Sequence, residues 1–404
     1  MSRKLRNGPQ LEADAYEGRG VGVSASKHEV RGALERWDQG LFPGAFCKAV
    51  PDILGGSPEH CAVMHADGVG PKSAVAYIHY RRHGDPKIFR SLAQDSLVMN
   101  LDDLLCVGCT GPFVFSNTIG RNAKRIPGDV IAEIIHGYEE FAECLRAFGV
   151  ELVSCGGETA DLGDLVRTLV IDSSIAARMR REDFIDCSRV SAGQAIVGLA
   201  SFGQASYETG WNSGIGTNGF TALRHALFKS EYREEFPETY AFEISEAAYR
   251  GSHDIDDMLP DASCSLGEAC LSPTRTYAPI MFPIIRNYRP HISAIFHNTG
   301  GGQTKCLNFG HNVKYVKDDL FPAPPLFQFL GSQTDLTARE MVQIFNMGHR
   351  MEVVCDPKIV NDIAAIAASF NVEAKVVGHV ARSTGRSLAI RVANEWCEFQ
   401  AADA

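Results

Sequence analysis

The stretch PGDVIAEIIHGYEEFAECLRAFGVELVSCGGETAD, residues 127–161, decides the fold class of this 404-residue chain. Apolar side chains recur in its first part at steps of three and four residues, which predicts an amphipathic helix over 127–148. Gly149 stands where a glycine commonly ends a helix, and the apolar residues 150–155 that follow predict a strand. A helix that passes directly into a buried strand is typical of an α/β fold.

The alternation of helix and strand continues on both sides of this stretch and divides the chain into two α/β regions. The further elements that we expect are a helix over 29–37, strands over 61–66, 168–177, 195–200 and 293–297, a helix over 91–105 and a β-α-β unit over 351–380. At roughly 100–200 residues per domain, the length suffices for two domains with insertions. We therefore expect a polar arm (1–23), an N-terminal domain (24–185) and a C-terminal domain (186–404) with a charged insertion at about 230–270.

Composition excludes several classes of function. The 49 acidic residues outnumber the 39 basic ones, and the resulting net charge of −10 argues against nucleic acid as the main partner. No apolar run approaches the roughly 20 residues of a membrane helix, and the basic start MSRKLRNGPQ leads into no apolar segment of a secretory signal. Twelve cysteines spread over this length predict buried, unpaired thiols. We therefore expect a cytoplasmic protein.

Acidic residues gather around two glycine motifs and one predicted helix. Asp67 and Glu158 are each expected in a glycine-flanked turn directly after a strand. Asp95 and Asp102 are seven residues apart, so they share a face of the predicted helix, with Asp103 beside them. Turns after strands meet at the carboxyl edge of an α/β sheet, where ligands bind. Converging carboxylates suit Mg²⁺ shared with nucleotide phosphates; the alternative is that each acid is a solvated side chain or a helix cap.

Other patterns carry less weight. GVGPKS (68–73) lacks the spacing of a P-loop, and GIGTNG (214–219) matches G-x-G-x-x-G without the preceding strand that a dinucleotide site needs. A phosphate could still bind at the helix start near Asn218.

Cys106-Val107-Gly108-Cys109 has C-x-x-C spacing, but no second pair completes a zinc site, and a redox role is the minor alternative. The acidic cluster at 253–257 is expected to be solvated surface.

His297 ends an apolar strand directly before three glycines. Such a position suits a side chain that contacts substrate. A buried structural histidine is an equally good interpretation, and both stay open at this point.

Six motifs, taken in order, carry a resemblance to a known family. They are HADGVGPK (65–72), AQDSLVMNLDDLLCVG (93–108), GGETAD (156–161), LSPTRTYAP (271–279), HNTGGG (297–302) and IFNMGHRM (344–351). In this order and over about residues 20–392, the sequence resembles the phosphoribosylformylglycinamidine cyclo-ligases, or aminoimidazole ribonucleotide synthetases. Any one motif alone would be weak, but the ordered set is specific.

The resemblance implies an α/β (α+β) fold of two domains, the sheet of the N-terminal domain pairing with that of a second subunit in a homodimer. ATP and Mg²⁺ are then expected near the dimer interface. The implied reaction, a step of purine biosynthesis, phosphorylates the formyl amide oxygen of formylglycinamidine ribonucleotide. An internal nitrogen then attacks, closing the imidazole ring and expelling phosphate. Such a reaction needs positioning and charge neutralisation more than a protein nucleophile.

Site roles follow by position from the same resemblance. The implied catalytic residues are Lys72, Asp95 and His297. The implied ATP-binding residues are Lys27, Gly44, Asp67, Gly68, Gly70, Gly157, Glu158 and Thr159. The implied substrate-binding residues are Asn218, Gly300, Gly301 and Gly302, and the implied metal ligands are Asp67, Asp95, Asp103 and Glu158.

Some positions depart from the family pattern. Pro71 stands where the family has Thr, Asp102 replaces Asn, and a compact histidine-bearing loop is stretched into residues 203–219 without a histidine. The glycine-rich arm is reduced to residues 42–46. These departures affect the expected identity of the substrate more than the expected use of ATP. Two alternatives therefore remain: a related ATP-dependent phosphoryl-transfer enzyme acting on another small molecule, and a non-catalytic nucleotide-binding paralogue.

Overall fold

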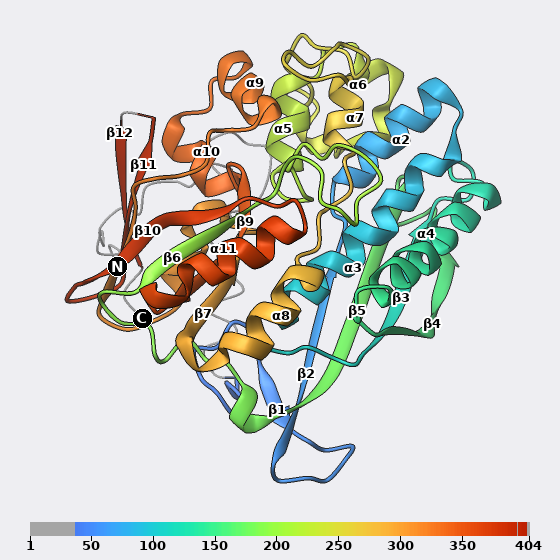
Figure 1. The fold of residues 1–404 in the computed structure, drawn as a ribbon. Helices are drawn as coiled ribbons and strands as arrows, with labels where there is room; N and C mark the ends of the chain where they lie inside the picture. The colour runs from blue at the N-terminus through green and yellow to red at the C-terminus, as the bar shows by residue number, and fades with distance from the viewer. Residues whose placement is uncertain (1–36, 394, 402–404) are drawn as a thin grey trace, which may run out of the picture.

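The computed structural model describes residues 37–393 and 395–401, so the arm, Lys27 and all but the last residue of the helix expected over 29–37 lie outside the described residues. Two mixed sheets form the centre of the molecule, which confirms the expected α/β class (Figure 1). The N-terminal sheet has the order β1-β2-β5-β3-β4. Its strands are β1 (Ala49–Pro51), β2 (His60–Gly68), β3 (Phe113–Arg121), β4 (Leu152–Asp161) and β5 (Leu169–Arg180).

Helices α3 (Arg90–Leu105) and α4 (Gly128–Arg146) cover one face of this sheet (Figure 1). The helix expected over 127–148 is therefore confirmed as α4, and its apolar stripe of Ile134, Phe141 and Leu145 is buried. Burial of such a stripe against the sheet supplies most of the stability of a helix of this kind.

Asp67, Gly68 and the whole GGETAD motif lie inside strands, not in turns after them, which corrects the sequence-based expectation, whereas Gly70 and Pro71 form a turn as expected. β2 continues through Asp67, which pairs with Ser173, and β4 continues through Glu158, which pairs with Thr118. β2 keeps β5 as its partner along its whole length, and β4 keeps β3 on both sides of a bulge at Cys155 and Gly156. Inter-strand hydrogen bonds therefore prolong segments whose own residues favour turns.

The other face of the N-terminal sheet is not covered by any described helix. Met64, Ala176, Val114 and Val153 oppose one another in register and form a row across four strands. Met64 is 62% exposed, Val114 44% and Val153 46%. An apolar row of this kind on a sheet face is unusual for a surface in contact with water.

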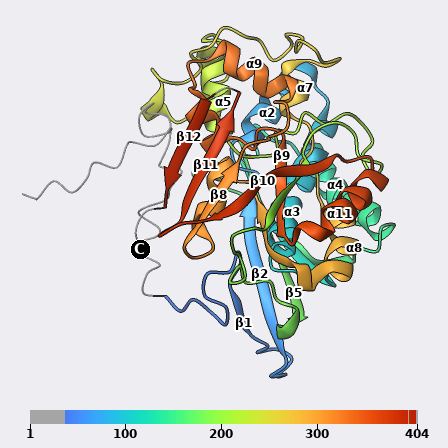
Figure 2. The same ribbon diagram turned by 60° about the vertical axis from the view of Figure 1, so that its left-hand side comes forward.

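The C-terminal sheet has the order β12-β11-β8-β10-β6-β9-β7. Figure 2 shows the part of it formed by β12, β11, β8 and β10. Its strands are β6 (Ala195–Ala200), β7 (Ile292–His297), β8 (Val313–Lys317), β9 (His349–Cys355), β10 (Ala374–Arg382), β11 (Ser387–Val392) and β12 (Glu395–Gln400). Two helices, α8 (Ala278–Tyr288) and α11 (Val360–Ser369), pack beside this sheet, and α8 also contacts α3. The expected β-α-β unit is present as β9, α11 and β10, with β6 between its two strands.

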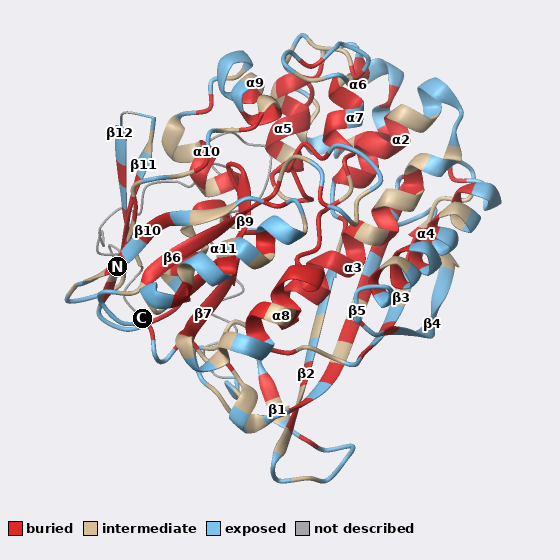
Figure 3. Ribbon diagram, viewed as in Figure 1, coloured by how far each residue is buried: buried red, intermediate tan, exposed pale blue. Residues whose placement is uncertain are grey.

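The segment 230–270 is more deeply packed than a solvated insertion would be. It contains α6 (Tyr232–Glu235) and α7 (Leu266–Cys270) and lies beside α2 (Lys72–His83) (Figures 1 and 3). Tyr232 and Leu259 are buried, and Glu238 pairs with Arg125 at 2.7 Å. Asp254 accepts a hydrogen bond from the Tyr232 hydroxyl and pairs with Arg82 of α2 at 3.1 Å. The expectation of a purely solvated acidic cluster at 253–257 is therefore wrong for Asp254.

The remaining helices are α5 (Phe220–Leu227), α9 (Pro325–Gln333) and α10 (Ala338–Ile344). None of the helices in the described part of the chain has the length and apolar character needed to span a bilayer. The twelve cysteines are unpaired, and most of them are buried, in agreement with the composition.

Candidate functional site

The four acids expected to share a metal do not meet within one chain. Asp67 on β2 and Glu158 on β4 are separated by β5 and β3, three inter-strand steps or about 14 Å. The register also places them in adjacent rows, since Asp67 lies opposite Ser173 whereas Glu158 shares its row with Asp172. The expectation failed because it placed both acids in turns at one sheet edge.

Asp95 is paired with a lysine and accepts its hydrogen bonds through Oδ1, while its buried Oδ2 accepts none. The Lys72 ammonium lies 3.0 and 2.9 Å from its two oxygens, and the Thr274 amide donates to it at 2.7 Å. Lys72 also donates to the carbonyl oxygen of Ser272 at 2.7 Å, and the side chains of Lys72 and Asp95 are completely buried. Burial lowers the pKa of Lys72, and Asp95 acts against that shift. Asp95 is therefore held beside a lysine in this structure, and its role as a metal ligand stays a prediction.

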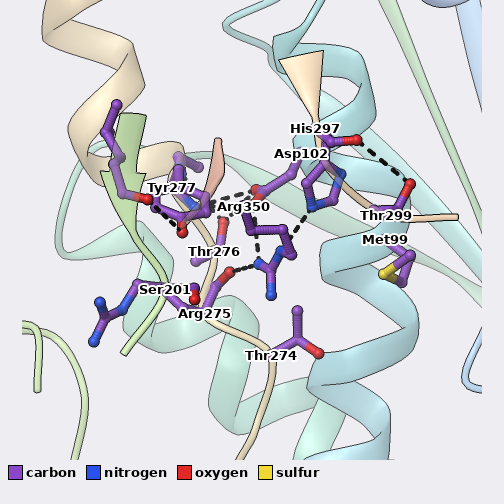
Figure 4. Close-up of polar contacts among 12 residues, drawn as sticks. Met99, Asp102, Ser201, Thr274, Arg275, Thr276, Tyr277, His297, Thr299 and Arg350 are labelled. Carbon is purple, nitrogen blue, oxygen red and sulfur yellow. Dashed lines mark hydrogen bonds and ion pairs between the residues drawn. The ribbon is translucent and has the colours of Figure 1, made fainter. Parts of the chain in front are cut away.

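Asp103 and His297 form the polar centre between the two domains. His297 ends β7, and its Nδ1 lies 2.6 Å from Asp103 Oδ1. On its other side, the Arg350 Nε donates to His297 Nε2 at 2.9 Å (Figure 4). Because a guanidinium only donates, Nε2 must be the acceptor and Nδ1 must carry the proton. Burial lowers the pKa of His297 to about 4, against the pull of Asp103, so the ring is neutral at pH 7.

Asp102 points to the C-terminal domain rather than to the carboxylates of the N-terminal sheet. It accepts hydrogen bonds from the Thr276 hydroxyl at 2.7 Å and the Tyr277 amide at 3.0 Å, and Arg350 Nη2 lies 3.8 Å away. Figure 4 shows the Arg350 guanidinium between Asp102 and His297. Burial raises the pKa of Asp102 to about 7, although Arg350 and Thr276 oppose the shift.

The three-glycine loop leaves backbone exposed beside a lysine. Gly300 has open space around its Cα, and the Lys305 ammonium donates to the Thr299 hydroxyl at 3.3 Å. The same ammonium lies 5.3 Å from the ring centre of Phe46, so the short arm segment reaches this loop. Open amide groups beside an ammonium suit a phosphate or carboxylate.

A buried ion pair lies behind this loop. Lys317 Nζ is 2.6 Å from Glu352 Oε1 and donates to the Gln303 carbonyl at 2.8 Å. His349 Nε2 lies 2.8 Å from the same Glu352 oxygen. Burial alone would raise the pKa of Glu352, but Lys317 and His349 outweigh it and bring the pKa to about 2. The pair therefore holds Gln303, the residue after Gly302, in place.

Models of one protein family match both domains of the chain. The N-terminal domain of AIR synthase related protein matches residues 48–178, and the C-terminal domain of AIR synthase related protein matches residues 191–390. The chain belongs to the AIR synthase related family.

Two curated relatives in this family carry the same name. A phosphoribosylformylglycinamidine cyclo-ligase of Methanocaldococcus jannaschii is 27% identical over 325 residues, covering 80% of this chain and 79% of the relative. One of Staphylococcus aureus is 28% identical over 332 residues, covering 81% of this chain and 82% of the relative. The resemblance seen in the six motifs is therefore confirmed.

Solved structures share the fold of this AIR synthase related chain. The HypE-HypF complex matches with a TM-score of 0.56 at 14% identity, covering 93% of this chain and 99% of the other. PurL of Thermotoga maritima complexed with ADP matches with a TM-score of 0.53 at 14% identity over 93% of this chain. The chain spans about half the length of PurL, 48%. At these identities the likeness concerns the fold alone.

Three of the ATP-binding residues expected for the AIR synthase related family line a cavity. Gly157, Glu158 and Thr159 border a space of about 470 Å³ between α4, β3 and β4, together with Asn117 and Arg146. A volume of this size is in the range of small-molecule sites. Asp67, Gly68, Gly70 and Lys72 do not line it, so the expected ATP-binding set is divided between two places in the chain.

The stretched loop of this AIR synthase related chain forms one wall of a second cavity. Tyr207, Trp211 and Asn212 border a space of about 320 Å³ against Gln94 of α3 and Pro273. Further along, the Thr217 hydroxyl lies 3.0 Å from Met99 Sδ of α3, and Asn218 follows it, half-buried, just before α5.

The GIGTNG pattern packs against Phe345, the residue directly after α10. Gly219 has a φ of 82°, and a Cβ there would lie 2.3 Å from the Phe345 ring, so only glycine fits. Close packing against Phe345 therefore accounts for Gly219, and no dinucleotide-binding site is needed to explain it.

Sequence reasoning placed His297 and Asp103 but missed Arg350, Lys305 and His65. Asp102 was a sequence signal for Arg350, because a buried acid at a position where the family has a neutral residue needs a cation nearby.

Gly44 lies in the segment before β1, with no described atom near a Cβ built on it.

Proposed function

We propose that this chain is an ATP-dependent cyclo-ligase that converts formylglycinamidine ribonucleotide to aminoimidazole ribonucleotide, with release of ADP and phosphate. The observation that carries the proposal is the match to relatives named phosphoribosylformylglycinamidine cyclo-ligase over about four fifths of the chain. The buried Asp103–His297–Arg350 arrangement beside an open glycine loop supports it, because the reaction needs fixed polar groups more than a nucleophile.

The substrate side of the proposed site is the loop 298–302. Lys305 and the exposed backbone of Gly300 and Gly301 suit the phosphate of a ribonucleotide. His297 is then a buried positioning residue, neutral and with its tautomer fixed by Arg350, which holds Asp103 on the inner side of this loop. Asn218, on the loop beside α3, completes the substrate-binding set.

Lys72 and Asp95 have a different part in this proposal from the one expected. Because both are completely buried and tied to Ser272 and Thr274, we assign them the task of positioning the segment 272–276. That segment includes Thr276, which donates to Asp102 in the polar centre.

The nucleotide belongs to the N-terminal sheet in this proposal. Gly68 and Glu158 stand at the two ends of one row that also contains Asp172 and Thr118. A second copy of the chain, covering the apolar row that starts at Met64, would enclose this region in a cytoplasmic homodimer. No step of the proposal depends on Mg²⁺ at the four predicted carboxylates, since they do not converge in one chain.

A single assay tests the reaction. The purified chain is incubated with formylglycinamidine ribonucleotide, ATP and Mg²⁺, and ADP and the imidazole product are measured separately. We expect both to form in equal amounts. We expect His297→Asn to lower turnover by about a hundredfold or more, since positioned polar groups commonly contribute this much. His311→Asn, which changes an exposed histidine, is the matched control and should leave turnover unchanged.

A second candidate function is ATP-dependent phosphoryl transfer to another small molecule. The pairing of Asp102 with Arg350 and the 203–219 loop favour it, because both alter the substrate side of the site. ADP formation with a different substrate and no imidazole product would establish this candidate. No ADP with any substrate would leave the non-catalytic paralogue.

A further inference from the structure

Three metal-ligating side chains from separate parts of the N-terminal domain converge beside the polar centre. Cys47 precedes β1, His65 lies on β2 and Asp103 on α3, and one ligand atom of each lies within 4.8 Å of the others. Within residues 37–393 and 395–401, no other group of three such side chains meets this distance. Cys47 and Asp103 are buried, and His65 is partly exposed, which leaves a path for an ion.

The hydrogen bonds of Asn100 decide which nitrogen of His65 carries a proton. The Asn100 Nδ2 group faces three carbonyl oxygens, those of Asp67, Ser96 and Ser173, at 2.8 to 3.1 Å. Nδ2 is therefore the amide nitrogen, and Oδ1 is the atom that lies 3.0 Å from His65 Nδ1. Because Oδ1 only accepts, His65 Nδ1 must carry a hydrogen.

This assignment leaves His65 Nε2 facing a carboxylate. Nε2 lies 3.2 Å from Asp103 Oδ2. In a neutral ring with its hydrogen on Nδ1, the Nε2 lone pair would point at a negative oxygen, which is repulsive. A metal ion bound by both atoms removes the repulsion.

The separation fits a tetrahedral ion. Nitrogen and oxygen ligands at about 2.0–2.1 Å from a tetrahedral metal lie about 3.4 Å apart. The observed 3.2 Å is close to this value. The surrounding bonds also resemble those of a metal site, because Asn100 orients His65 and His297 occupies the other Asp103 oxygen at 2.6 Å.

We propose that Cys47, His65 and Asp103 bind a zinc-class divalent ion through Sγ, Nε2 and Oδ2, with the fourth tetrahedral position open. Sulfur and nitrogen ligands exclude Mg²⁺ and Ca²⁺, which take oxygen. The Cys47 thiol at present contacts the Asp103 carbonyl oxygen at 3.3 Å. On binding, the thiol loses its proton to solvent and the S–metal bond forms, so that thiolate and carboxylate neutralise the two charges of the ion.

The proposed metal site shares Asp103 with the polar centre of the proposed cyclo-ligase, but metal binding can be measured without the reaction. The ring-closing reaction needs no thiolate-bound metal, so absence of the imidazole product in the enzyme assay leaves the metal proposal intact. Conversely, loss of the metal proposal leaves the cyclo-ligase proposal intact. The two are therefore tested by different measurements.

Cobalt substitution is the direct test. The metal-free full chain is titrated with Co²⁺, and we expect one equivalent to produce a thiolate-to-cobalt charge-transfer band in the near ultraviolet together with visible bands of a four-coordinate ion. Zn²⁺ should displace the cobalt and abolish both. In Cys47→Ala the charge-transfer band should disappear, and in His65→Ala the affinity for Co²⁺ should fall at least tenfold.

Matched variants keep the test decisive. Cys355→Ala removes another buried thiol, and His311→Ala removes an exposed histidine, so both should retain the full spectrum. If Cys47→Ala does not fold, His65→Asn, at a partly exposed position, replaces it. A wild-type chain that gives no charge-transfer band with one equivalent of Co²⁺ overturns the proposal, and so does a band that survives in Cys47→Ala.

Discussion

Arg350 links two buried side chains of the polar centre that no other residue connects in the described part of the chain. Its Nε fixes the tautomer of His297, and its Nη2 lies beside Asp102. Its guanidinium also stacks over Tyr277, 5.5 Å from the ring centre. A lysine could not replace it, because one ammonium cannot serve a histidine, a carboxylate and an aromatic face in this planar arrangement.

The stability of the chain should depend on pH through Asp102. The folded chain holds a proton on Asp102 up to about pH 7, whereas the unfolded chain releases it near 3.8. Stability is therefore lost as pH rises from about 4 to about 7 and is constant above that range. Asp102→Asn cannot ionise, so between pH 5 and 8 we expect it to gain about 2–3 kcal/mol in unfolding free energy relative to wild type, measured with urea.

A control separates this effect from general changes with pH. Asp164→Asn changes an exposed acid and should follow the wild-type curve throughout. If the unfolding free energies of wild type and Asp102→Asn changed with pH in the same way, the raised pKa of Asp102 would be contradicted.

Sequence reasoning reached part of the site at this scale. A histidine at the end of an apolar strand and acids at helical spacing were sufficient to single out His297 and Asp103. Their partners could not be predicted, because Arg350, Lys305 and His65 come from other elements and meet them only through tertiary packing. Charged residues next to apolar ones are usually exposed, and nothing local in the sequence marks these three as buried or paired.

At the scale of elements, β2 and β4 show how pairing overrides local preference. Residues such as Gly68 and Gly157 favour turns, and the sequence predicted turns there. The long partners β5 and β3 supply hydrogen bonds to both motifs, so the strands continue. Helix boundaries were predicted more closely, since helical periodicity is a local property, as α3 and α4 confirm.

The Lys317–Glu352 pair ties β8 to β9 and should dominate the acid stability of the C-terminal sheet. In Lys317→Met, Glu352 is left buried beside a neutral side chain, so we expect a loss of about 3–5 kcal/mol at pH 7 by urea unfolding. Lys314→Met in the same strand removes an exposed pair with Glu398 and should cost less than about 1 kcal/mol. Equal costs for the two variants would contradict the argument.

The same pair predicts a pH dependence of opposite sign to that of Asp102. Lys317 and His349 lower the pKa of Glu352 from 4.5 to about 2. Its contribution to stability is therefore complete above pH 4.5 and is lost as pH falls towards 2. In Glu352→Gln, the unfolding free energy should not show this loss between pH 4.5 and 2. A loss of unchanged size in that variant would mean that other carboxylates cause it.

At the scale of the whole molecule, the uncovered face of the N-terminal sheet is the feature that a single chain does not explain. We expect wild type to be a dimer of twice 44.0 kDa by light scattering. Val114→Glu places a charge in the middle of the apolar row and should give a monomer, because a buried unpaired carboxylate is costly in an interface.

An exposed position away from this face provides the comparison. Leu165 is 83% exposed and lies in the turn between β4 and β5, so Leu165→Glu should remain dimeric. A monomeric wild type at micromolar concentration, or a dimeric Val114→Glu, would exclude this face as the interface.

The contact of Lys72 and Asp95 with Ser272 and Thr274 also limits how the two domains can move. Parting the domains would break the bonds from Lys72 to Ser272 and from Thr274 to Asp95 and would expose the ammonium and the carboxylate. The ion pair and its hydrogen bonds hold the two domains together, and separating the domains breaks several of these bonds at once. We therefore expect separation of the two domains to be costly, so that ligand exchange without domain opening is favoured.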